Sequence, residues 1–309
     1  MSKIECFPCP DDARWHELRA PDITASVAPA LLGIHEYKTA FSVYQEKTGA
    51  VKDSVSDTGA VRRGRLLEPV AVQVLREDNP SWAIRYNNGE DRVYYREAET
   101  RLGATPDVEV VSERGKGVVQ IKSVAERIYR QKWCANGAPE PPLWIAVQTI
   151  IEATLTGSEW AAVMPLVVDN ELITPIIDIP LNSGVMDRVR AAVADFWDRV
   201  ARNDPYPPDY KRDGDTLLSL YGSDDGSTID LTGWNQGPEL AAEDARLAGD
   251  IKIASDRRKA IKAELLDKMG SAAVATIDGR VFATAKTVKR KGFTVDDTEY
   301  RNVTFKRSA

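Results

Sequence analysis

Alternating apolar and polar positions between residues 108 and 122 give the clearest structural signal in the chain. Val108 and Val110 alternate with more polar neighbours, turn-forming residues occupy 112–117, and a second alternation follows. This pattern predicts a β-hairpin. Because positions two apart in a strand share a face, the polar residues of the second strand point together, away from its apolar residues. The polar pair is Gln120 and Lys122, and the apolar pair is Val119 and Ile121.

Helical spacing of apolar residues predicts most of the other elements before residue 208. Pro69 fits a first helical turn, where its missing N–H is not needed, so Glu68 is expected near a helix N-terminus. We expect an α/β or α+β fold with helices flanking a mixed central sheet. The expected helices cover residues 15–19, 24–33, 41–47, 67–75, 124–133, a stretch ending at 155, and 182–202, and further strands cover 160–168 and 172–179.

The chain changes character after the prolines at 205, 207 and 208. We expect three parts: a first globular domain over 1–210, a linker with one short strand over 211–238, and an accessory or oligomerisation region over 239–309. The last region combines a long polar helix with a hairpin at Asp278-Gly279, a basic segment and a final strand pair. Its basic residues form either a solvated face or a surface for DNA or a partner; they are Arg257, Arg258, Lys259, Lys286, Lys289, Arg290 and Lys291.

Composition and charge narrow the classes of function. The chain has 309 residues and a formal net charge of -6, which excludes a nucleic-acid binder that works through its total charge. Any contact with DNA needs a local basic surface or a channel built by an assembly. No apolar run reaches the length of a membrane span, and the first residues lack the apolar core of a signal peptide.

Three cysteines provide no framework of paired disulfides, so we expect a reducing cytoplasm. Cys6 and Cys9 form a CxxC motif, but zinc needs four ligands and only Cys134, His16 and His35 remain at unrelated spacings. We expect two ordinary thiols.

The hairpin carries the first candidate chemistry. Asp107 opens the first strand, and pairing of the strands brings its carboxylate close to Gln120 and Lys122. Two oxygen donors and a lysine suit a hard cation beside a polarised water. A solvated strand face is the alternative interpretation.

Two other groups of residues suit phosphate binding. A helix start at Ser26 near Arg19 offers free N–H groups, a hydroxyl and a guanidinium, although simple capping and a salt bridge explain them equally. Gln148 interrupts an apolar helix and needs a hydrogen-bond partner, which neighbouring backbone can also supply. The densest basic cluster of the N-terminal half, on a face that is either solvated or bound to phosphates, is Arg62, Arg63 and Arg65.

Several ordered motifs together resemble the YqaJ-type viral recombinase family, which includes the phage lambda exonuclease. The likeness covers about residues 13–208. Its motifs are Trp15-His16-x-Leu18-Arg19, Ile23-Thr24-Ala25-Ser26, Gly33, Lys47-Thr48-Gly49, Gly64-Arg65-x-x-Glu68-Pro69, the hairpin and Gln148. Pro106-Asp107 and Gln120-Ile121-Lys122 further resemble the PD-(D/E)XK nuclease superfamily, with glutamine in place of the acidic residue.

The resemblance implies a restriction-endonuclease-like core and roles for particular residues. Magnesium, as one or two ions for which manganese can substitute, is expected to bind Glu68, Asp107, Gln120 and the carbonyl of Ile121. Lys122 then orients or deprotonates the attacking water. A 5′-phosphate is expected to bind Arg19, Ser26, Thr105 and Gln148.

The resemblance also implies a biological setting. The family acts as a 5′ to 3′ exonuclease on double-stranded DNA ends, leaving 3′ single strands for a phage annealing protein. It forms ring-shaped homo-oligomers, of which a trimer is favoured here, in the cytoplasm of a bacterial host that carries the phage or prophage.

Gln120 leaves three functions open. An amide oxygen ligates magnesium without charge, so we expect weaker binding of one metal ion, a higher magnesium requirement, and a gain from Gln120→Glu. The alternatives to an active exonuclease are a DNA-end-binding recombination module with feeble catalysis and an endonuclease of the same core. No Walker A or GxSxG motif supports a motor or an esterase.

Overall fold

The structure is a computed structural model that describes residues 3–52, 59–135, 137–292, 297 and 301–305. The chain forms two compact units, residues 1–220 and 221–309. The first unit contains every residue to which the sequence assigns a role in catalysis or phosphate binding.

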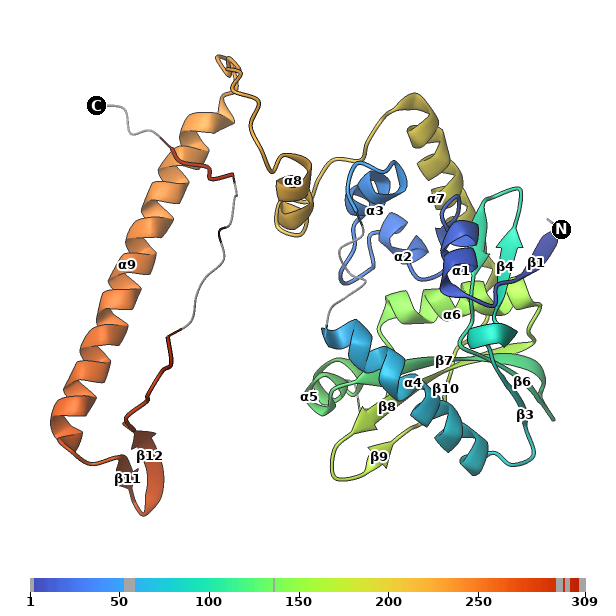
Figure 1. The fold of residues 1–309 in the computed structure, drawn as a ribbon, viewed down its shortest axis with the longest axis horizontal. Coiled ribbons are helices and arrows are strands. Elements are labelled where there is room, and N and C mark those ends of the chain that lie inside the picture. Colours follow the sequence, from blue (N-terminus) through green and yellow to red (C-terminus); the bar gives the residue numbers. More distant parts are fainter. Residues whose placement is uncertain (1–2, 53–58, 136, 293–296, 298–300, 306–309) are drawn as a thin grey trace. The chain divides into compact units, whose positions relative to one another are not determined.

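A six-stranded mixed sheet is the centre of the first unit (Figure 1). Strands β7 and β8 are parallel, and the remaining pairs are antiparallel. The strand order is β10 (Ile177–Asp178), β8 (Trp160–Val168), β7 (Gly115–Val124), β6 (Val108–Ser112) and β3 (Ala83–Tyr86), with β9 (Leu172–Ile173) paired to β8.

The predicted hairpin is confirmed as β6 and β7. Val108 lies opposite Val119 in the antiparallel ladder. Val119 and Ile121 are buried in a core cluster with side chains of α4 (Gly59–Asp78). Because side chains alternate along a strand, Gln120 and Lys122 face the other side of the sheet. That side carries α6 (Leu143–Thr156), which packs on β7 and β8.

A second, four-stranded sheet lies in the same unit, in the order β1 (Ile4–Pro8), β4 (Val93–Glu97), β5 (Leu102–Ala104) and β2 (Ile23–Thr24). Helix α6 also contacts β4 and β5, so it packs against strands of both sheets. Residues 105–107 connect β5 to β6 and carry the chain from the smaller sheet to the larger one. Thr105 and Asp107 therefore lie where the two sheets meet α6.

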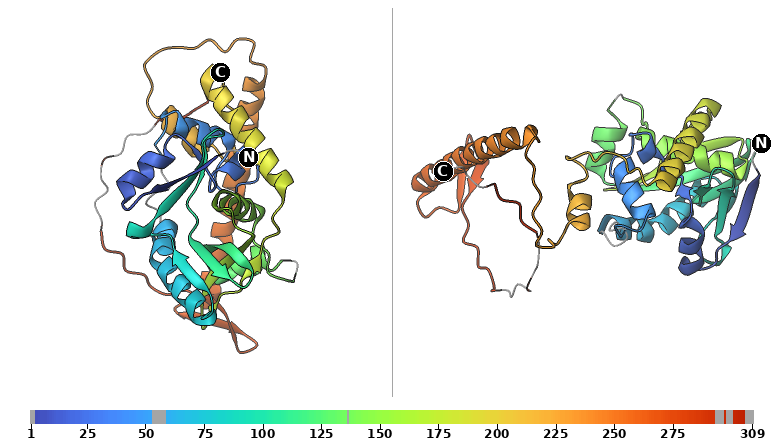
Figure 2. Two further views of the ribbon diagram at one scale, coloured as in Figure 1. Left: turned by 90° about the vertical axis from the view of Figure 1, so that its right-hand side faces the viewer. Right: turned by 90° about the horizontal axis from the view of Figure 1, so that it is seen from above.

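Besides α4 and α6, this unit contains further helices, some of which follow the predicted apolar patterns closely. In α7, Val189, Val193 and Phe196 are fully buried at the predicted spacing, and Asn182 caps the first turn. These helices are α1 (Asp12–Arg19), α2 (Ala28–Leu31), α3 (Ala40–Lys47), α5 (Glu126–Ile128), a π-helical turn at Tyr129–Trp133, α7 (Ser183–Arg202) and α8 (Gly214–Leu220), seen from two further directions in Figure 2.

The predicted helix over 24–33 is wrong in its first half. Ile23 and Thr24 pair with β5 as an extended strand, and the helix that follows is a single turn capped by Val27 without a side-chain hydrogen bond. Ser26 therefore caps no helix, and the expected phosphate site at a helix N-terminus is absent from this described segment. Pairing with the sheet outweighs the local capping signal here.

The expected position of Glu68 in a first helical turn is also wrong. Helix α4 begins at Gly59, so Pro69 lies inside it. Proline removes one intrahelical hydrogen bond. Burial of Ala71, Val72 and Leu75 against the large sheet stabilises the helix through tertiary packing.

Two smaller expectations also differ from the structure. The strand expected over 172–179 is divided into β9 and β10, with Pro175, which has no N–H to donate to a ladder, between them. The part of the chain expected as a linker with a short strand contains helix α8 in place of that strand.

The second unit contains a long helix, α9 (Gln236–Met269), and a hairpin of β11 (Val274–Ile277) and β12 (Arg280–Thr284). Asp278 and Gly279 both have positive φ, as a two-residue hairpin turn requires. The strand pair expected after residue 291 lies largely outside the described residues. Among the described residues, no helix has both the length and the apolar character that crossing a membrane requires.

Candidate active site

A pocket of about 170 Å³ collects most of the predicted site residues. It lies where α1, β2, the 105–107 connection, β7 and α6 come together. The predicted residues that line it are Arg19, Ser26, Thr105, Asp107, Gln120, Lys122 and Gln148, and they are joined there by Trp15, Thr24, Ala25 and Glu152.

Asp107 is fixed against strand β7 by two hydrogen bonds to one carboxylate oxygen. Its Oδ2 accepts from the backbone N–H of Ile121 at 2.8 Å and from the side-chain amide of Gln120. The carbonyl oxygen of Ile121 lies 3.5 Å from the same amide nitrogen. Because Gln120 uses its nitrogen on Asp107, its buried Oε1 has no hydrogen-bond partner among the described residues.

Two neighbouring charged side chains shift the pKa of Asp107 in opposite directions. Burial and the negative charge of Glu68 raise the pKa of Asp107 to about 7, while Lys122 lowers it. Both side chains therefore interact with this carboxylate. Glu68 does not line the pocket, and its Oε1 accepts a hydrogen bond from the hydroxyl of Tyr86 at 2.9 Å.

The lining of the pocket also includes a guanidinium and three hydroxyls. The guanidinium of Arg19 stacks on the ring of Trp15, 3.9 Å from its centroid. The indole N–H of Trp15 donates to Oγ1 of Thr105 at 2.9 Å, which fixes that hydroxyl. The hydroxyls of Thr24 and Ser26 lie 3.1 Å apart. A fork-shaped cation beside hydroxyls suits a phosphate group.

Helix α6 adds two buried polar side chains, one of which the sequence interpretation missed. Gln148 and Glu152 are 5% and 1% exposed. The amide of Gln148 donates to Oε1 of Glu152 at 2.8 Å, which gives Gln148 the partner that its burial required. Polar residues at positions i and i+4 of an apolar helix share a face, and this spacing was the available signal for Glu152.

Two further buried oxygens, Oε1 of Gln148 and Oε2 of Glu152, have no partner among the described residues. Each unsatisfied buried polar atom costs about 1–3 kcal/mol. Burial and the neighbouring charge of Asp107 raise the pKa of Glu152 well above its usual range.

The oxygen atoms in the pocket fit a hard divalent cation. In the described part of the chain, no group of three or more His, Cys, Asp or Glu side chains is arranged to hold a metal. The pocket instead offers carboxylate and amide oxygens together, which are ligands suited to magnesium and manganese. The orphaned oxygens of Gln120, Gln148 and Glu152 would gain in such a site the partner that they lack.

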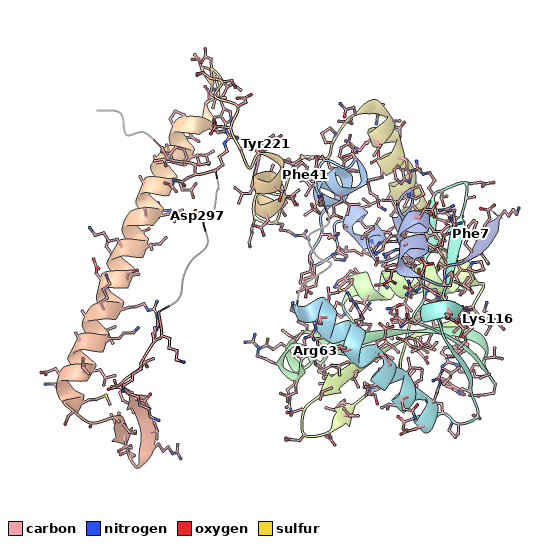
Figure 3. All side chains as sticks on the ribbon, viewed as in Figure 1. Phe7, Phe41, Arg63, Lys116, Tyr221 and Asp297 are labelled. Carbon is pink, nitrogen blue, oxygen red and sulfur yellow. The ribbon has the colours of Figure 1, made fainter. Side chains whose placement is uncertain are left out.

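The basic cluster of α4 lies apart from this pocket. Arg62 and Arg65 are exposed. Arg63, which is labelled in Figure 3, donates a hydrogen bond of 3.5 Å to the carbonyl of Val124 at the end of β7. None of the three lines the pocket. Their contact with DNA phosphates stays a prediction.

Comparison with known proteins agrees with this geometry. Residues 14–164 match the family model described as YqaJ-like viral recombinase domain. This part of the chain is similar to a YqaJ-like viral recombinase domain. All residues that line the pocket, from Trp15 to Glu152, lie inside the matched range. The match to this family model supports the interpretation that the chain is a nuclease that acts on DNA.

Solved structures of exonucleases are also similar to this chain. An alkaline exonuclease, LHK-Exo from Laribacter hongkongensis, is 15% identical over 66% of this chain and 99% of that chain, with a TM-score of 0.47. A phage related exonuclease from Haemophilus somnus 129PT is 12% identical over 59% and 96%, with a TM-score of 0.44. No curated protein sequence matches the chain.

Proposed function

We propose that this YqaJ-like protein is an exonuclease that requires a divalent metal and degrades double-stranded DNA from 5′ ends, leaving 3′ single strands. The observation that carries the proposal is one pocket that combines Asp107 and Lys122 with Arg19 and two hydroxyls. A carboxylate and a lysine serve phosphodiester hydrolysis, and the guanidinium and hydroxyls serve recognition of a terminal phosphate.

The residues that would hold magnesium are Asp107, Gln120 and the carbonyl of Ile121, with Glu68 close by. A bound divalent cation polarises a phosphoryl oxygen and lowers the pKa of water. Lys122 interacts with Asp107. As an ammonium it would orient the attacking water, and as a neutral amine it would accept the proton of that water.

The residues that would bind the terminal phosphate set the direction of degradation. Arg19 donates charge-assisted hydrogen bonds to the terminal phosphate, and the hydroxyls of Ser26 and Thr105 donate alongside it. Gln148 keeps a second amide N–H for the same group. A terminal phosphate held there places the end nucleotide over Asp107 and Lys122, so an interior stretch of DNA without a free end binds poorly.

The proposal extends to partners. The net charge of -6 opposes DNA at long range, and a ring-shaped homo-oligomer, with a trimer as the first expectation, would concentrate local basic residues around the duplex. The 3′ single strands would then pass to a phage annealing protein.

One observation favours a second candidate, a DNA-end-binding recombination module with feeble catalysis. Gln120 supplies an uncharged oxygen where nucleases with this motif carry a carboxylate, which weakens the attraction for a metal ion.

Digestion of labelled DNA separates these functions. Linear duplex labelled at its 5′ or 3′ ends and closed circular duplex are incubated with and without magnesium. An exonuclease of the proposed polarity releases the 5′ label first, only with magnesium, and leaves the circle intact. Binding to ends without release of label supports the end-binding module, and nicking of the circle shows an endonuclease.

A further inference from the structure

Glu152 is a buried carboxylate with one unused oxygen, inside the pocket that holds Asp107 and Lys122. Its side chain is 1% exposed, and Oε1 accepts the hydrogen bond from Gln148. Oε2 has no partner among the described residues, so it lacks a hydrogen bond whether the carboxyl group is ionised or protonated. A charged carboxylate lacks a counter-charge on that oxygen, and a protonated one lacks an acceptor for its O–H.

The position of Glu152 on α6 brings it to the face of β7 that carries Gln120. Helix α6 packs directly on β7, and Gln120 and Lys122 lie on its side of the sheet. Glu152 and Gln120 therefore line the same pocket, one from α6 and the other from β7.

The orphaned oxygens in this pocket come from both elements. Oε1 of Gln120 belongs to β7, while Oε1 of Gln148 and Oε2 of Glu152 belong to α6. These three buried acceptors belong to residues that line the same pocket as Asp107 and Lys122. A divalent cation is the group that satisfies several such oxygens at once.

We propose that Glu152 is a metal ligand, and that helix α6 supplies the carboxylate that strand β7 lacks at Gln120. The inference rests on the proposed function, because it takes the pocket to be the metal centre of a nuclease. The amide of Gln148 positions Glu152 by holding its Oε1. With a carboxylate at Glu152 on α6, the site has the charge that a carboxylate at position 120 on β7 would give it.

Manganese binding measured by electron paramagnetic resonance tests this inference without depending on catalysis. The full-length protein is titrated with Mn²⁺, and the signal of the free ion gives the affinity. Glu152→Gln keeps the shape of the side chain and removes its charge, so we expect affinity to fall about tenfold or more. Glu159→Gln is the matched control, since this exposed glutamate lies just after the same helix and does not line the pocket.

A charge swap makes the test sharper. In the double variant Gln120→Glu with Glu152→Gln, the carboxylate returns to the strand, and we expect Mn²⁺ affinity to recover to within about threefold of the original protein. Circular dichroism and thermal unfolding confirm that each variant is folded. A poorly folded Glu152→Gln protein is replaced by Glu152→Asp, which keeps the charge and shortens its reach, and is expected to weaken Mn²⁺ binding.

The outcomes separate this inference from the proposed function. If the original protein binds Mn²⁺ and degrades linear DNA, but folded Glu152→Gln binds Mn²⁺ as tightly as the Glu159→Gln control, Glu152 is no ligand and the inference fails alone. If the original protein binds no Mn²⁺ and degrades no DNA, the proposed function fails and this inference with it. Loss in Glu152→Gln with recovery in the swap supports both.

Discussion

Asp107 is the central carboxylate of the candidate site. Its carboxylate is held by the backbone of Ile121 and the amide of Gln120, and burial and the charge of Glu68 raise its pKa to about 7. A bound cation would strongly favour the ionised form of this carboxylate. Its positive charge would offset both the repulsion from Glu68 and the cost of burying the negative charge.

Alternation along a strand was enough to predict which face Gln120 and Lys122 occupy. Glu152 was not predicted, because a glutamate in a helix is most often solvated, and only its tertiary position shows that it is buried. Gln148 was recognised as a buried amide that needs a partner, but the sequence alone did not identify Glu152 as that partner.

Lys122 tests the catalytic assignment. Replacing it by methionine keeps the aliphatic length and removes the ammonium, so DNA degradation should fall by about 100-fold or more. The affinity for Mn²⁺ should not fall, because the substitution removes a positive charge that would repel the metal ion. Lys211→Met, at an exposed position, is the control and should degrade DNA at the original rate. A Lys122→Met protein of normal activity would show that this lysine takes no part in hydrolysis.

Arg19 tests recognition of the terminal phosphate. Its replacement by alanine should reduce the preference for 5′-phosphorylated over 5′-hydroxyl duplex ends by about tenfold, since a charge-assisted hydrogen bond is lost. The measurement is the ratio of the degradation rates of the two substrates. Arg14→Ala on the same helix, where the guanidinium pairs with Glu17 at the surface, should leave the ratio unchanged. An equal fall of both rates in Arg19→Ala would indicate a structural role.

Helix α6 is the element that joins the two sheets at the candidate site. It packs against both sheets and presents Gln148 and Glu152 to the pocket. The hairpin, α6 and α7 followed from periodicity, because each buries a continuous apolar face. The segment 23–33 and the start of α4 did not, because strand pairing with β5 and packing on the large sheet decide those structures and neither is visible in a local pattern.

The segment after α2 carries a pH-sensitive group beside the site. Nδ1 of His35 accepts hydrogen bonds from the N–H groups of Tyr37 and Lys38, both at 3.0 Å, and burial lowers its pKa from 6.5 to about 4. The unfolded chain therefore takes up a proton between about pH 6.5 and 4 that the folded protein does not. The free energy of unfolding should fall as the pH is lowered through this window.

Urea unfolding at pH 7 and pH 5 measures this contribution. His35→Asn retains an acceptor for the two N–H groups and cannot be protonated. We expect the original protein to lose about 1–2 kcal/mol more than the variant between the two pH values. Equal losses would show that His35 is protonated equally in the folded and unfolded states.

At the scale of the whole molecule, the site and the long helix belong to different compact units. The core clusters that surround the pocket involve residues before 221, whereas α9 buries little apart from Met269. Leu247, Ile251 and Ile261 of α9 are each at least 44% exposed. The second unit is therefore not needed to build the pocket.

Truncation after residue 220 tests this division. The shortened protein has its own core and should unfold cooperatively and degrade short linear duplexes in the presence of magnesium. Thermal unfolding followed by circular dichroism and a digestion assay with short duplexes check both expectations. A truncated protein that is folded but inactive on every linear substrate would place part of the active site in residues 221–309.

The most direct test of the metal-dependent site is anomalous diffraction from crystals of this protein soaked in manganese. We expect a manganese peak inside the pocket, within bonding distance of Asp107 and Glu152 and beside Oε1 of Gln120. A pocket without a peak in crystals whose soaked protein degrades DNA with manganese, or a peak bound only elsewhere on the chain, would contradict it.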